Sequence, residues 1–220
     1  MTFANVAIMV TILLVVMVAS MLYYGSRGKK KIRLGFDALA EALGGSVEQK
    51  NRMHYPHLKT SFEGRPVECF FHLSEGHRKT SDIVYLVIST PVELPSASLA
   101  VKEGVFAAAE GKGSFNDVAG GYLEDVLPGR YVYGADEDYT KALCKDPAVA
   151  AAIATLERYP NIVLGPDAIT IGKPYGGAPD LRLDRMSGDL GQLVALGQAV
   201  DAVASGAGKT AEAEVAKPSA

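Results

Sequence analysis

The chain has 220 residues, of which 48% are apolar and 21% charged, a composition that suits one folded domain with short additions and excludes a wholly disordered chain. Its formal charge is −3, but five of its 22 basic residues and none of its 25 acidic ones lie in residues 1–33, so residues 34–220 form an acidic body. Such a body is repelled by phosphate backbones, which argues against nucleic acid as a partner.

Residues 3–24 contain no charged side chain. A helix of this length measures roughly 33 Å, enough to cross a hydrocarbon core of about 30 Å. The alternative is a cleaved signal peptide, but the segment lacks a basic start and a small-residue cleavage site. The sequence therefore predicts a transmembrane anchor in residues 1–26, with Tyr23 and Tyr24 in the interfacial aromatic belt where the helix leaves the bilayer.

A basic collar, residues 27–33, follows the anchor directly. Its members are Arg27, Lys29, Lys30, Lys31 and Arg33. Basic residues beside a span stay on the cytoplasmic side, which predicts a single-pass protein of the inner (cytoplasmic) membrane with its N-terminus outside and its globular domain in the cytoplasm. A plainer interpretation is that the collar only ends the helix and contacts anionic headgroups. Both interpretations place these side chains at a membrane surface.

The globular domain is expected to span residues 34–204 and to begin with a short amphipathic helix that ends at Gly44 and Gly45. Alternating apolar residues on both sides of Glu63 and Gly64 predict a β-hairpin over residues 58–73. The unbroken apolar run that starts at Ile83 is typical of a central strand covered on both faces. These three strands are consecutive and are expected to be antiparallel.

The remaining segments complete an α+β pattern, in which one mostly antiparallel sheet packs with helices behind the N-terminal transmembrane helix. Short strands are expected near residues 99–102 and at 131–134, with a loop between them over residues 104–121. Asp136 and Asp146 each precede a helix, the second with proline at its favoured first position. A hairpin follows over residues 161–172, then an amphipathic helix over residues 189–204, and residues 205–220 are expected to be a disordered tail.

All four histidines lie within a short region that also contains a cysteine: His54, His57, Cys69, His72 and His77. Imidazole and thiolate are natural zinc ligands. However, the histidine and cysteine three residues apart on the predicted strand point to opposite faces, which favours surface histidines and a core cysteine over a metal site. Cys144 is the only other cysteine, so a disulfide framework is not expected, although the two thiols could pair.

The acids Asp136, Glu137 and Asp138 could bind a cation or act in acid–base chemistry, but acids also favour a helix N-terminus, which is the simpler interpretation. The segment "SGAGKT" at residues 205–210 ends like a phosphate-binding loop but lacks its first glycine and its preceding strand, so no nucleotide is expected there. The chain contains no GxSxG, HExxH or GxGxxG motif. No catalytic residue, metal or cofactor is therefore assigned.

The order of segments resembles a group of functionally uncharacterised bacterial membrane-anchored proteins. The resemblance rests on "YPHLKTSFEGRPVECFF", "TPVELPSASLAV", "GADEDYTKALCKDPAVAAAIATL" and "NIVLGPDAITI", which all lie in residues 34–204. It implies an α+β body on a membrane tether and carries over no catalytic residue. The leading hypothesis is a protein-binding accessory or scaffold subunit. The alternative is a membrane-associated enzyme that uses the histidine and cysteine region or the acids at residues 136–138.

Overall fold

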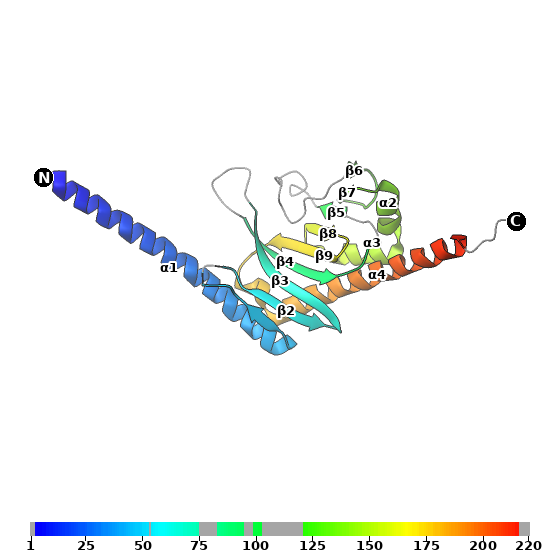
Figure 1. Cartoon of the computed structure of the whole chain (residues 1–220), viewed down its shortest axis with the longest axis horizontal. Helices are drawn as coiled ribbons and strands as arrows, with labels where there is room; N and C mark the ends of the chain where they lie inside the picture. Colours follow the sequence, from blue (N-terminus) through cyan, green and yellow to red (C-terminus); the bar gives the residue numbers. More distant parts are fainter. Residues whose placement is uncertain (1–2, 53, 75–82, 95–98, 103–120, 216–220) are drawn as a thin grey trace.

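The body has an α+β fold in which helices pack on one antiparallel sheet (Figure 1). The computed structural model describes residues 3–52, 54–74, 83–94, 99–102 and 121–215, with backbone only for residues 3–8, 19, 21–26, 74 and 207–215. The helices are α1 (Phe3–Leu43), α2 (Glu137–Lys145), α3 (Pro147–Thr155), the short 3-10 helix η2 (Ala178–Leu181) and α4 (Leu183–Val215). The strands are β1 (Ser46–Glu48), β2 (His57–Phe62), β3 (Arg65–Ser74), β4 (Ile83–Pro91), β5 (Leu99–Lys102), β6 (Gly121–Leu123), β7 (Tyr131–Gly134), β8 (Asn161–Leu164) and β9 (Ala168–Pro174).

The described strands form one sheet in the order β1-β2-β3-β4-β9-β8-β5-β7-β6, and every neighbouring pair is antiparallel. The predicted hairpin between β2 and β3 is confirmed, with Phe62 opposite Arg65. Its two turn residues, Glu63 and Gly64, have φ angles of 50° and 79°, as a tight two-residue hairpin turn requires. The hairpin between β8 and β9 is also confirmed.

Strand β5 lies between β7 and β8 and is antiparallel to both, so β7 and β8 run parallel to each other. Parallel strands need a crossover connection, and the pair α2 and α3 supplies it. Asp136 accepts a hydrogen bond from the Tyr139 amide at the start of α2, and Asp146 accepts from the amides of Ala148 and Val149 at the start of α3. Both predicted helix starts are therefore confirmed, and α3 ends at Thr155.

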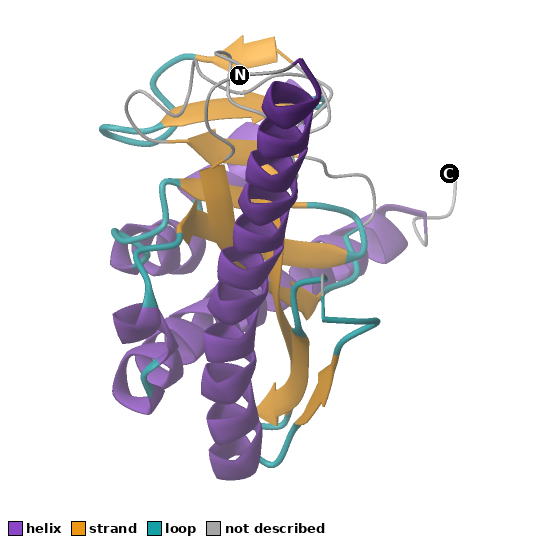
Figure 2. Ribbon diagram, turned by 90° about the vertical axis from the view of Figure 1, so that its left-hand side faces the viewer, coloured by secondary structure: helices purple, strands orange, loops and turns teal. Residues whose placement is uncertain are grey.

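All four α-helices contribute to one buried apolar cluster on the same face of the sheet (Figure 2). Alternate residues of the strands complete this cluster, as period-two patterning requires. Its members include Phe36 and Leu39 of α1, Leu143 of α2, Ile153 of α3, Leu190 and Leu193 of α4, and Leu58, Cys69, Leu86, Ile88, Ile162 and Ile171 of the sheet. On the other face Tyr85 and Val87 are buried as well, which confirms that β4 is covered on both sides.

Helix α1 is continuous from Phe3 to Leu43 and projects from the body (Figure 1). The predicted boundaries after residues 26 and 33 fall inside it, because Gly25 and Gly28 cost a helix only about 1 kcal/mol each. The predicted end is confirmed: Gly44 has a φ of 72° and the Gly45 amide donates to the Ala40 carbonyl. Among the residues that the structure describes, no helix combines the length and apolar character that crossing a membrane demands.

The tail prediction requires correction in part. Helix α4 begins at Leu183 and continues to Val215, so the backbone is helical over residues 205–215 where disorder was expected. This stretch contains three alanines, two glutamates and one lysine, which have high helix propensity and let a helix continue without burying an apolar face despite two glycines. The "SGAGKT" segment is therefore part of a helix. Residues 216–220 and most of the expected loop at residues 104–121 lie outside the described residues.

Candidate functional site

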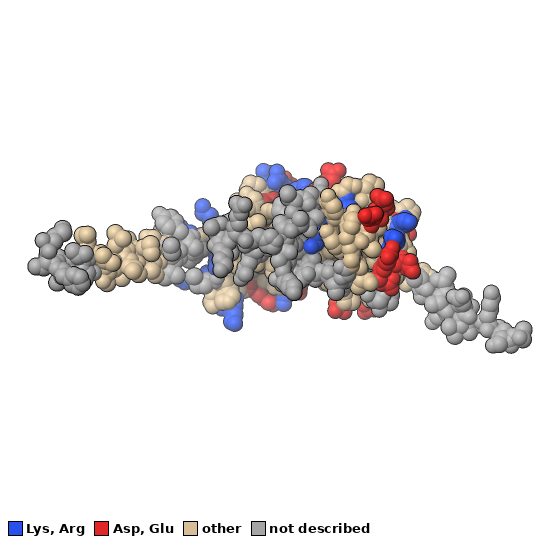
Figure 3. Space-filling view, turned by 90° about the horizontal axis from the view of Figure 1, so that it is seen from above, with Lys and Arg blue, Asp and Glu red and all other residues tan. Residues whose placement is uncertain are grey.

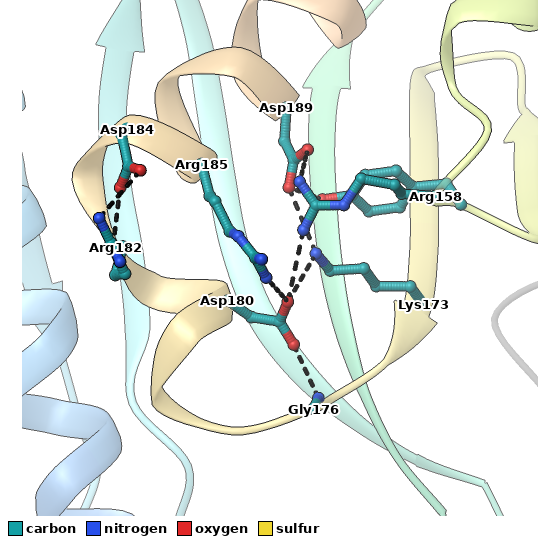
Figure 4. Close-up of polar contacts among 9 residues, drawn as sticks. Arg158, Lys173, Gly176, Asp180, Arg182, Asp184, Arg185 and Asp189 are labelled. Atoms are coloured by element: carbon teal, nitrogen blue, oxygen red, sulfur yellow. Dashed lines mark hydrogen bonds and ion pairs between the residues drawn. The ribbon is translucent and has the colours of Figure 1, made fainter.

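A buried charged network lies between the sheet and the start of α4 (Figure 4). Lys173 follows Ile169 and Ile171 at alternate positions of β9, so its side chain lies on the helix-covered face. Asp180 comes from η2 and Asp189 from the second turn of α4. The Lys173 side chain is 6% exposed and the two aspartates are 10% and 3% exposed. Such groups are almost never buried unless they are paired.

The pairing in this network is direct. Nζ of Lys173 lies 3.0 Å from Oδ1 of Asp180 and 3.3 Å from Oδ2 of Asp189. The half-exposed Arg158, in the turn that follows α3, approaches the same two carboxylates at 3.4 Å and 3.1 Å. Two cations thus face two buried anions, and the guanidinium of Arg185 lies 3.9 Å from Asp180 at the outer side.

Neutral donors also bind the two carboxylates. The Tyr159 hydroxyl donates to Oδ2 of Asp189 over 2.6 Å, and the Gly176 amide donates to Oδ2 of Asp180 over 2.7 Å. Burial, together with the adjacent Asp189 carboxylate, holds the pKa of the Tyr159 phenol well above its ordinary value. The phenol therefore keeps its proton at neutral pH and acts as a donor. Since each carboxylate is saturated by protein groups, the network joins β9, η2, the segment after α3 and α4 rather than presenting a reactive group.

The predicted histidine and cysteine region does not converge on one point. Cys69 pairs with Leu58 and faces the buried core, where burial raises its pKa to about 12. His72 lies on the opposite face of β3, and burial lowers its pKa. Nε2 of His57 lies 3.2 Å from a Glu68 carboxylate oxygen, but outside hydrogen-bond geometry.

His54 lies in the loop between β1 and β2, where its ring nitrogen is 2.7 Å from the Asn51 side-chain oxygen. His77 lies outside the described residues. No set of three histidine, cysteine, aspartate or glutamate side chains among the described residues is placed to hold a metal ion. Of the predicted acids, Asp136 caps α2 and Glu137 pairs with Lys141 one turn later, so both act locally at this helix.

A second candidate site is a row of tyrosines at the far edge of the sheet. Tyr122 of β6 lies opposite Tyr133 of β7, with ring centroids 5.7 Å apart, and Tyr131 lies 5.9 Å from Tyr122. Tyr122 and Tyr131 are 49% and 44% exposed. The Lys102 ammonium lies 5.3 Å from the Tyr133 ring. Because β6 ends the sheet order, these rings flank a strand edge that no described strand covers.

A hollow of about 520 Å³ adjoins this tyrosine row. Its lining includes Tyr122, Tyr131, Asp125, Pro128 and Arg130. The guanidinium of Arg130 donates to the backbone carbonyls at the end of α3, which fixes the loop that forms the wall of the hollow. The sequence prediction did not single out this site, although the spacing of Tyr131 and Tyr133 already placed them on one face of a strand.

The basic collar lies where α1 enters the body. Arg27, Lys30 and Lys31 are exposed, whereas Ile32 is already buried in the core. Arg33 bonds to the Gln49 side chain over 3.1 Å, so the collar also contacts the β1–β2 loop. Side chains of Tyr23 and Tyr24 lie outside those that the structure describes.

Comparison with known proteins identifies a fold neighbour and no family. No family model and no curated protein matches the chain. A solved structure, the mycobacterial trehalose monomycolate transport factor A, TtfA, is similar with a TM-score of 0.52 and 11% sequence identity, over 80% of this chain and 93% of that chain. At this identity the likeness defines the fold alone. It agrees with the mixed α+β architecture described above.

Proposed function

We propose that the chain is a single-pass membrane protein whose cytoplasmic α+β domain binds another protein as an accessory or scaffold subunit. In this proposal residues 1–26 are the anchor, residues 27–33 the collar and residues 34–204 the domain. The N-terminus lies outside the cytoplasmic membrane, as basic flanks dictate. The resemblance to bacterial membrane-anchored proteins supports the same arrangement.

One observation supports the proposed transmembrane anchor. The large apolar side chains of residues 9–18 are 44–71% exposed around the projecting part of α1. A helix that exposes apolar side chains on every side needs an apolar environment, since soluble helices bury one stripe and expose a polar one. The uncharged sequence extends this run to residues 3–24, which is long enough to span.

The tyrosine row supports the partner-binding half of the proposal. Half-exposed tyrosines supply large contact area at low entropic cost and are enriched in protein interfaces. Exposed acids lie beyond both ends of the row: Glu124 and Asp125 follow β6, and Asp136, Glu137 and Asp138 follow β7. Aromatic faces with acidic neighbours suit lysine or arginine side chains. We therefore assign this surface to a basic segment of a partner protein.

The fold neighbour suggests one form of this role. TtfA is named as a transport factor. Its name suggests that this chain could act as an accessory of a transport process. No observation on the described residues favours the alternative, a membrane-associated enzyme. The thiol of Cys69 is buried with a pKa of about 12, and Asp136 is engaged in capping α2.

Photo-crosslinking in native membranes tests the proposal. A benzoylphenylalanine in place of Tyr131 should crosslink one discrete protein through a lysine- or arginine-rich peptide, and Asp125→Lys should reduce the yield by charge repulsion. The matched control carries the crosslinker at Ser46, on the opposite edge of the sheet. Undiminished crosslinking in Asp125→Lys, or equal yield from Ser46, contradicts the assigned surface. Extraction of the full chain by alkaline carbonate contradicts the anchor.

A further inference from the structure

The loop between β1 and β2, described over residues 49–52 and 54–56, lies beside the basic collar. Arg33 donates to the Gln49 side chain over 3.1 Å, and Gln49 in turn donates to the His54 carbonyl over 2.7 Å. The Lys29 ammonium lies 4.9 Å from the centroid of the Tyr55 ring. These contacts hold both ends of the loop against the same two turns of α1.

This arrangement brings two further cations to the collar. Lys50 and Arg52 are exposed in the loop, so seven basic residues lie in two neighbouring segments. Two acids next to these segments in the sequence are already paired, Asp37 with Arg33 and Glu48 with Lys59. Figure 3 shows basic side chains where α1 enters the body, whereas acidic side chains gather toward the other end.

The helix rise sets the distance of the loop from the bilayer. If α1 leaves the hydrocarbon core near residue 24, Lys29 and Arg33 lie about 7 and 14 Å above that level at 1.5 Å per residue. The headgroup layer occupies about 5–7 Å of this distance. The loop therefore begins within one Debye length, about 8 Å at physiological ionic strength, of the headgroup phosphates.

We infer that the β1–β2 loop is a second membrane contact, which docks the domain onto anionic lipid headgroups of the bilayer that α1 enters. This inference rests on the proposed anchor. With α1 and the loop both held, the domain has a defined orientation on the membrane. The tyrosine row, at the opposite edge of the sheet, then remains accessible from the cytoplasm.

The full chain in lipid nanodiscs provides the test. A polarity-sensitive thiol dye on His54→Cys reports headgroup contact. Labelling is selective because Cys69 and Cys144 are buried, and burial raises their pKa values to about 12 and about 11. We expect a blue shift in nanodiscs that contain phosphatidylglycerol, none in pure phosphatidylcholine, and loss of the shift at high salt.

Substitution of the loop cations makes the test specific. Each basic side chain at an anionic surface contributes about fivefold to binding, so Lys50→Gln/Arg52→Gln should lower the docked-to-undocked ratio roughly thirtyfold. The control Lys141→Gln/Lys145→Gln removes the same charge from α2 and should keep the shift. A blue shift that does not depend on lipid charge, or that persists after the loop substitutions, overturns the inference about the loop but leaves the proposed anchor standing. Failure of the chain to enter nanodiscs contradicts the anchor, and the inference with it.

Discussion

The buried network makes a quantitative prediction for Lys173→Met. Methionine keeps the length and apolar stem of lysine but removes the ammonium that faces Asp180 and Asp189 at 3.0 and 3.3 Å. Arg158 then remains as the main counter-charge, and it is half exposed. Removing one partner of a buried ion pair typically costs 3–5 kcal/mol because an uncompensated charge stays buried. Since Arg158 and the Tyr159 hydroxyl remain, we expect about 3 kcal/mol.

Urea unfolding of the full chain, solubilised in a mild detergent and followed by circular dichroism, measures this loss. With a slope of about 2 kcal/mol per molar urea, a loss of about 3 kcal/mol lowers the unfolding midpoint by about 1.5 M. The double variant Lys173→Met/Asp189→Asn should lose less than the sum of its two single variants, because the second change removes one of the buried charges that the first leaves uncompensated.

A matched control separates burial from pairing. Lys141 also forms an ion pair, with Glu137, but on the exposed surface of α2. Lys141→Met should therefore leave the urea unfolding midpoint nearly unchanged. If both methionine variants lost the same amount, or if Lys173→Met lost less than about 1 kcal/mol, the stabilising role assigned to the network would be refuted.

Three further predictions use the same urea titration. Gly45→Ala should lower the unfolding free energy by about 1–3 kcal/mol, because the added Cβ would lie 2.5 Å from the Lys59 carbonyl oxygen. The control Gly121→Ala has open space around its Cβ and should change the unfolding free energy by no more than about 0.5 kcal/mol. Equal losses in the two variants would contradict the clash. Asp146→Ala should cost about 1 kcal/mol through the lost cap of α3, and no loss would show that the cap is dispensable. Stability should fall from pH 9 to 12, because burial raises the Cys69 pKa from 9.0 to about 12 and the unfolded chain loses this proton first; a decline that is unchanged in Cys69→Ala contradicts the assignment.

The sheet could be predicted largely from the sequence because its longer strands have an alternating or continuous apolar pattern. Strands β2, β3, β4 and β9 are six to ten residues long, which is enough for a period of two to emerge. Strands β1 and β6 have three residues each and pair through backbone groups, so they leave no such pattern. The continuity of α1 was missed for another reason: glycine favours a break but does not enforce one.

The buried network could not be predicted because its members are spread along the chain and meet only after β9 packs on α4. One signal was present. Ile169, Ile171 and Lys173 alternate, so the lysine occupies a position whose pattern demands burial and therefore a partner. Which carboxylates would meet it depends on tertiary packing. The tyrosine row likewise needs the pairing of β6 with β7 to bring Tyr122 beside Tyr133.

The network and helix α1 are linked through η2. Asp180 of η2 is held by Lys173, and the next residue, Leu181, packs so closely under α1 that a Cβ on Gly35 would lie 2.9 Å from its side chain. Helix α1 is continuous and is fixed on the body from Ile32 onward. The direction in which it leaves the sheet therefore depends on this contact between η2 and α1. The buried charges thus stabilise the position of η2, whose contact with α1 orients that helix. In the proposed arrangement, the same contact determines how the tyrosine row faces the cytoplasm.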